Sequence, residues 1–232
     1  MFTMSLTFVG TLDRSTVPSA FGQLTELVGS ARVAELWSEE SALPGMTVGG
    51  LTRHLVSQPE CAVEFLTAPI PPGAAISSLV GHYERVDWFH APIDAPENTS
   101  ICDHFNELGA AGPDESVEVL TRSIGQLAAA MAAAGPTTYV PWQDCALPTD
   151  DFLVIRLMEL AVHADDLAFS VGVKPPKFVP AVLDPVLALL AALANRRHGQ
   201  EVVLRSLSRH ERSSGQASAF GPAETSTPRH AG

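Results

Sequence analysis

Four polar side chains occur at helical spacing in an otherwise apolar segment of the chain. Arg156, Glu159, His163 and Asp166 fall within an arc of roughly 80° when about 100° is allowed for each residue of a helix. A helix that is hydrophobic on its other sides is typically buried. Burying a carboxylate, an imidazole and a guanidinium together is costly unless each finds a partner or a metal ion. The surrounding apolar residues include Leu153, Val154, Ile155, Leu157, Leu160, Val162 and Leu167.

The pair Glu159 and His163 is spaced to supply two ligands to one divalent ion, because residues four apart lie one above the other on a helix. A catalytic zinc site needs three protein ligands and keeps one position open. His54, in the apolar run Leu51 to Val56, is the candidate for the third. Spacing alone leaves two alternatives open. The pair could be solvated surface neighbours, and His54 could be a satisfied core histidine.

Proline, glycine and capping residues divide the chain into helical segments that would position these side chains. Thr47 is expected to cap the helix that carries His54, and Thr149 the helix that carries the polar stripe. The stretch 135–148 is expected to be a loop. Few strand signals occur, so the pattern predicts an all-α, up-and-down four-helix bundle with additional short helices. The expected helices cover 17–40, 47–66, 74–90, 98–108, 113–134, 149–171 and 179–196.

The C-terminal part of the chain is expected to be separate from the bundle. We assign residues 1–198 to a helical bundle, 199–212 to a short extension and 213–232 to a disordered tail. The stretch Glu201 to Leu207 could form a helical turn or a short strand. Beyond Ser213 the sequence is rich in Ser, Gly, Pro and Thr with little apolar content, which is typical of disorder.

Composition excludes several classes of function. Of 232 residues, 46% are hydrophobic and only 17% charged, with a formal net charge of −12. So few Lys and Arg argue against binding to nucleic acid or to anionic membranes. The sequence shows neither a signal peptide nor an apolar run of about 20 residues that could cross a bilayer. Three scattered cysteines form no disulfide framework, which favours a reducing cytoplasm.

Two motifs resemble a known family. Thr47-Val-Gly-Gly-Leu-Thr-Arg-His54-Leu-Val is similar to the second-helix signature of the mycothiol-dependent maleylpyruvate isomerase family. Arg156-Leu-Met-Glu159-Leu-Ala-Val-His163-Ala-Asp-Asp166-Leu, continuing to Gly172, resembles the same family's more specific pattern of Arg, Glu, His and Asp-Leu. Residues 106–114 and 140–142 are also similar, and the resemblance covers roughly 24–193. Its members are metal-binding proteins of the DinB-like superfamily of four-helix bundles.

The resemblance implies a metal enzyme that uses a thiol. His54, Glu159 and His163 would bind zinc or another divalent metal, with water or a thiolate in the open position. A bound thiol has a lowered pKa, so a nucleophilic thiolate exists at neutral pH. Mycothiol or a similar low-molecular-weight thiol would then add to an electrophilic small molecule, giving isomerisation or S-transfer. The substrate, the thiol and the metal are not named by the sequence.

Two further residues are candidates for catalytic roles. Asp166 lies one turn past His163 and could orient its imidazole, although Asp165 could compete. Arg156 could pair with Glu159, as a structural ion pair, or with a carboxylate of the substrate. Elsewhere, His82 or His104 could line the pocket or be ordinary polar residues at helix edges: His82 lies within 74–90 and His104 within 98–108.

The family's isomerases carry a separate C-terminal domain, and only about forty residues follow the last expected helix here. Isomerisation of maleylpyruvate itself is therefore in doubt. Two alternatives follow. One is a noncatalytic bundle that binds a small molecule or a protein partner. The other is a thiol-independent metal hydrolase that uses a zinc-bound hydroxide, with Asp166 or another acid as the base. A homodimer is possible, but the sequence indicates no interface.

Overall fold

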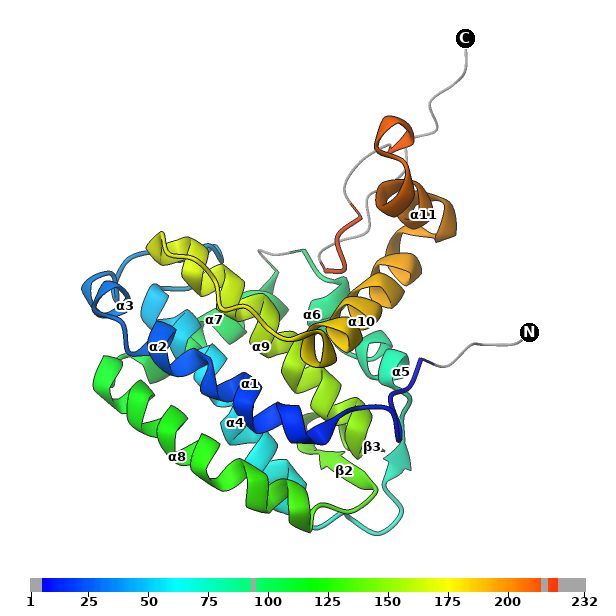
Figure 1. Cartoon of the computed structure of the whole chain (residues 1–232), viewed down its shortest axis with the longest axis horizontal. Helices are drawn as coiled ribbons and strands as arrows, with labels where there is room; N and C mark the ends of the chain where they lie inside the picture. The colour runs from blue at the N-terminus through cyan, green and yellow to red at the C-terminus, as the bar shows by residue number, and fades with distance from the viewer. Residues whose placement is uncertain (1–5, 93–94, 214–216, 221–232) are drawn as a thin grey trace.

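Helices dominate the fold and surround one apolar core (Figure 1). The structure is a computed structural model that describes residues 6–92, 95–213 and 217–220. Three long helices, α4 (Val48–Thr67), α8 (Pro113–Ala133) and α9 (Thr149–Val171), form the bundle with an N-terminal helical segment. Helix α7 (Pro96–Gly109) packs against α4, and α10 (Pro180–His198) packs against α9. The predicted helical bundle is confirmed.

The N-terminal segment is helical but broken, so the expectation of one helix over 17–40 is wrong. It consists of a 3-10 turn, Arg14–Thr16, followed by α1 (Val17–Gly22), α2 (Leu24–Val28) and α3 (Ala31–Glu35). Ser30 adopts an extended conformation, and its side chain accepts a hydrogen bond from Val33 N, so the chain starts a new helix there. The buried side chains of all three pieces nevertheless join the core.

Two other expectations are corrected by a small sheet. Strands β1 (Ala75–Ile76), β2 (Thr137–Val140) and β3 (Cys145–Pro148) pair in the order β1-β3-β2, antiparallel between β2 and β3 and parallel between β1 and β3. The region 74–90 is therefore not one helix, since β1 is followed by α5 (Leu79–Glu84) and α6 (Asp87–His90). The region 135–148 is a hairpin, with a 3-10 turn at Pro141–Gln143, instead of a loop.

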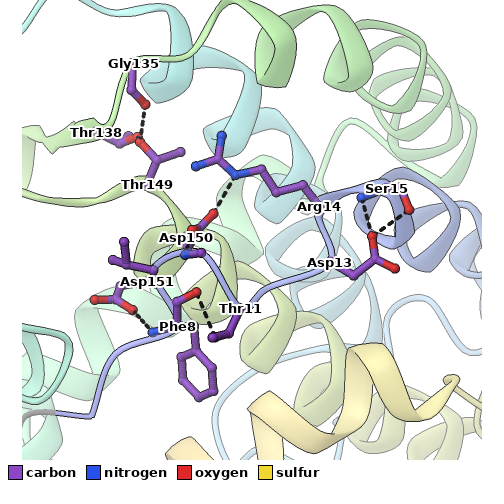
Figure 2. A network of polar contacts seen from close by, with 12 residues as sticks. Phe8, Thr11, Asp13, Arg14, Ser15, Gly135, Thr138, Thr149, Asp150 and Asp151 are labelled. Atoms are coloured by element: carbon purple, nitrogen blue, oxygen red, sulfur yellow. Dashed lines mark hydrogen bonds and ion pairs between the residues drawn. The ribbon is translucent and has the colours of Figure 1, made fainter.

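The first turn of α9 is tied to the N-terminal segment (Figure 2). Asp150 accepts a hydrogen bond from Gly10 N at 2.8 Å and forms an ion pair with Arg14. Asp151 accepts a hydrogen bond from Phe8 N at 2.6 Å. Thr149 is not the N-cap that the sequence suggested, because it is the first residue of α9 and its hydroxyl donates to Gly135 O. These contacts anchor the start of the helix that carries the polar stripe.

The start of α4 is fixed by a very close approach to α7. The Thr47 side chain caps α4 as predicted, accepting from Gly50 N at 2.9 Å. The Asn106 side chain of α7 accepts from Thr47 N at 2.9 Å. A Cβ atom added to Gly109 would lie only 2.9 Å from the carbonyl carbon of Gly49, so the two backbones meet where only glycine fits. This packing sets the position of His54, almost two turns further along α4.

Beyond the bundle, Gly199 with a φ of 83° separates α10 from α11 (Gln200–Ser208), which settles the alternative at 201–207 in favour of a helix. A 3-10 turn follows at His210–Arg212. The predicted tail, 213–232, lies mostly outside the described residues; within it, Phe220 packs against Tyr83 and Phe89. The proposed domain division stays a prediction. Among the described helices, none combines the length and apolar character needed to span a membrane.

Candidate metal centre

The structure brings His54, Glu159 and His163 together between α4 and α9. Oε2 of Glu159 lies 3.1 Å from Nε2 of His163 and 3.6 Å from Nε2 of His54. One potential ligand atom from each residue lies within 4.8 Å of those of the other two. The three side chains are largely buried, with side-chain exposures of 13–16%. Two imidazoles and one carboxylate therefore converge on one point inside the bundle.

Asp166 holds the far side of the His163 ring. Its Oδ2 lies 3.0 Å from Nδ1 of His163, while Nε2 of the same ring faces Glu159. Asp165, the competing residue, is exposed. A carboxylate on the second ring nitrogen is the usual companion of a metal-binding histidine, because it fixes the ring and makes the other nitrogen more basic.

The ring of His54 is held by aromatic contacts. The Phe105 ring of α7 lies 4.3 Å from it and the His163 ring 4.6 Å, both edge to face. Its Nδ1 is buried and has no hydrogen-bond partner among the described residues. Burial lowers the pKa of His54, so its imidazole is neutral at neutral pH and keeps a lone pair for coordination.

The other two groups carry opposite charges. Burial alone would raise the pKa of Glu159, but the hydrogen bond to His163, the nearby His54 and the charge of Arg156 hold it well below its usual range. Burial alone would lower the pKa of His163, but Asp166 and Glu159 raise it to about 9. Without a metal, the imidazolium of His163 lies between the carboxylates of Glu159 and Asp166 and offsets part of their negative charge. A divalent ion that binds Nε2 of His163 must displace its proton.

Arg156 lies one turn before Glu159 but forms no ion pair with it. Its Nη1 donates to Oε1 of Gln58 at 2.8 Å. The guanidinium carbon lies 5.9 Å from the centre of the Trp142 ring and 5.6 Å from that of Phe152. The alternative of an ion pair with Glu159 is therefore not realised, and the contact with a carboxylate of the substrate stays a prediction.

Sequence reasoning did not find all the residues around this centre. Gln58 stands four residues after His54 on α4, a spacing that would have placed it on the same face. Trp142, in the stretch 140–142 that resembles the family, was a possible lining residue, and it lies on the hairpin turn next to the Arg156 guanidinium. His82 is buried, and burial followed by the charge of Arg156 lowers its pKa to about 4. His104 is exposed, so it does not line the centre.

The donor set fits a divalent metal ion. Two imidazole nitrogens and one carboxylate oxygen are the ligands of many catalytic zinc sites, which keep a fourth position for water or substrate. The buried position and the Asp166–His163 hydrogen bond match such a site. The helical arrangement and these residues define the class of protein as a helical bundle with a candidate metal centre in its core.

Residues 17–168 match the family model described as the mycothiol maleylpyruvate isomerase N-terminal domain, and the chain belongs to this family. This confirms the resemblance noted in the two motifs: the first lies wholly within the matched region, and the second lies within it up to residue 168. Comparison with curated proteins and with solved structures gave no match.

Proposed function

We propose that this protein is a metal-dependent enzyme that activates a low-molecular-weight thiol for reaction with an electrophilic small molecule. The observation that carries the proposal is the convergence of His54, Glu159 and His163 on one point in a buried setting. Membership of the mycothiol maleylpyruvate isomerase family supports the thiol, with mycothiol or a similar molecule as the first candidate. We expect the enzyme to work in the reducing cytoplasm.

A divalent ion, with zinc as the first candidate, would lower the pKa of a thiol in its open position and so supply a thiolate at neutral pH. Side chains of the protein would hold the ion and orient its ligands. His54 and His163 offer neutral nitrogens, and Glu159 offsets part of the charge of the ion. Asp166 holds the His163 ring in the orientation that points Nε2 at the ion, which makes Asp166 a positioning residue. The apolar walls from α4 and α9 keep competing water away.

Addition of the thiol to an electrophilic carbon gives an S-conjugate. Where the electrophile is an alkene, rotation about the new single bond and loss of the thiol give the geometric isomer instead. The geometry does not favour the alternative of a thiol-independent hydrolase with Asp166 as its base, because that carboxylate already accepts from His163.

The test begins with elemental analysis of the purified protein. We expect one equivalent of a divalent metal in the wild type and its loss in the variant His54→Ala, with His104→Ala, an exposed histidine, as the matched control. Consumption of mycothiol is then followed with a panel of electrophiles. Absence of bound metal together with no affinity for added Zn²⁺ would refute the proposal. Metal binding with no thiol consumption would favour a noncatalytic binding protein, and activity without thiol a hydrolase.

A further inference from the structure

The C-terminal helical segment concentrates positive charge on an acidic protein. Residues 196–212 contain five of the chain's 14 lysine and arginine residues and two of its 26 aspartate and glutamate residues. The segment therefore has a formal charge of +3, whereas the rest of the chain has one of −15. Ion pairs within the chain occupy Arg196 and Arg205. Arg209 and Arg212 are exposed, and neither belongs to any ion pair among the described residues.

Helix α11 in this segment also exposes apolar side chains. Leu204 is 56% exposed and Leu207 73%, and the two lie one turn apart on the helix. Helix α11 packs on α10 and on the 3-10 turn that follows it, and Figure 1 shows it projecting beyond the bundle. Leu204 lines an open concavity of about 280 Å³ together with three arginines, Arg205, Arg209 and Arg212. A helix of this kind can lay its leucines into an apolar groove whose rim carries acids.

A groove of the opposite charge lies on another part of the same molecule. It has a volume of about 600 Å³ and is formed by residues 85–87, Glu97 and 141–144. Trp142, which is 54% exposed, supplies apolar surface there. The lining contains three acids, Asp87 and Glu97 among them, and one arginine, so its formal charge is −2. None of the described residues that line the groove belongs to α11.

The two surfaces complement each other in charge and in apolar character. Arginines lie beside exposed leucines on α11, and acids lie beside an exposed tryptophan in the groove. We propose that α11 of one protomer docks in this groove on a second copy of the chain. The occupant is a second copy because the same chain presents both surfaces, and complementary charge selects one partner over others. In Figure 1, α11 lies well away from the turn between β2 and β3, so it does not reach the groove of its own protomer.

Two reciprocal contacts close the assembly as a dimer with two-fold symmetry, since each protomer offers one helix and one groove. Helix α11 has nine residues. Stable interfaces bury about 1,200–2,000 Å² in total, more than one such helix in one groove provides, so a stable dimer needs both contacts. Because the fit depends on charge, the dimer should be tightest at low salt.

Sedimentation velocity of the full-length protein tests this dimer. We expect its dissociation constant to rise about tenfold or more between about 0.05 and 0.5 M NaCl. Arg209→Glu/Arg212→Glu should be monomeric because it sets acids against acids, and Asp87→Lys/Glu97→Lys because it sets bases against bases. An equimolar mixture of these two variants should dimerise again, since each acidic α11 then meets a basic groove and each basic α11 an acidic one. Should the lysine variant fail to fold, Asp87→Asn/Glu97→Gln decides, and a dissociation constant equal to that of the wild type counts against the groove.

The matched control is Glu118→Lys/Arg122→Glu, which reverses two exposed charges on α8 outside both surfaces and should leave the dimer unchanged. A wild type that stays monomeric, a dimer that is insensitive to salt, or a mixture of the two variants that fails to associate would each overturn the inference. A monomer that binds phosphatidylglycerol vesicles through Arg209 and Arg212 would overturn it in favour of a lipid surface. Circular dichroism of each variant confirms that it is folded before its mass is measured.

Discussion

The carboxylate of Asp166 lies 3.0 Å from Nδ1 of His163, on the side of the ring opposite to Glu159. This contact fixes which nitrogen of His163 faces the candidate metal centre. Asp166→Asn should therefore weaken metal affinity about 10- to 100-fold without unfolding the protein. Competition with a zinc chelator measures the change. The neighbouring exposed residue provides the control, because Asp165→Asn should leave the affinity unchanged, and an equal loss in both variants would contradict the assigned role.

The buried His82 should make stability depend on pH. Its pKa is lowered to about 4 in the fold, by burial and by the charges of Arg156 and Arg85, while Glu159 acts in the opposite direction. In the unfolded chain His82 has its ordinary pKa of 6.5, so the unfolded state binds more protons than the folded state between pH 6.5 and about pH 4. His82 should have no effect above pH 7, and stability should fall as the pH drops, by about 2 kcal/mol between pH 7 and pH 5.

Urea unfolding at pH 7 and pH 5 measures this dependence in the wild type and in His82→Gln. The variant should lose less stability on acidification, since its amide takes up no proton. The other acidic groups titrate in both proteins and cancel in the comparison. Identical losses of stability in the two proteins would show that folding does not lower the pKa of His82.

The close approach of α4 and α7 should tolerate no side chain at Gly109. A Cβ atom there would meet the backbone of Gly49 at 2.9–3.0 Å, and backbone cannot move aside as a side chain does. Gly109→Ala should destabilise the protein by about 1–3 kcal/mol. Gly125 in α8, where an added Cβ meets nothing within 4 Å, is the matched control. Gly125→Ala should stabilise by about 0.5–1 kcal/mol, as measured by urea unfolding.

The N-terminal segment should detach more readily from α9 when the carboxylate of Asp151 is removed. This buried carboxylate accepts hydrogen bonds from Phe8 N and from the Thr7 hydroxyl. Asp151→Ala leaves the part-buried amide of Phe8 without its acceptor, which should cost about 1–3 kcal/mol and speed up hydrogen exchange at residues 8–10. Asp184→Ala on α10 serves as a comparison. Unchanged exchange at Phe8 in Asp151→Ala would show that the segment is held by other contacts.

The polar stripe of α9 could be predicted as a site because four polar side chains on an apolar helix must be buried with partners or with a metal ion. His54 could be proposed as the third ligand from its place in an apolar helical run, but that run did not distinguish a ligand from a core histidine, because its partners lie on another helix. Gln58 was missed because its contact with Arg156 depends on how α4 and α9 cross, which no local pattern records. The break at Ser30 and the strand Thr137–Val140 carried local signals, a capping serine after glycine and a run of β-branched residues. The helical periodicity around Ser30 outweighed its signal, whereas Thr137–Val140 was assigned to a loop because the run is only four residues long.

Because His54 comes from α4 and the other two donors from α9, the set is complete only late in synthesis. A nascent chain that has emerged as far as the β2 strand offers only one of the three candidate donors, His54. A bound ion would then be held only after α9 has packed against α4, and it would cross-link segments far apart in the chain. Cellular metal supply would thus act on the finished fold, and chelators should lower its melting temperature instead of blocking its synthesis.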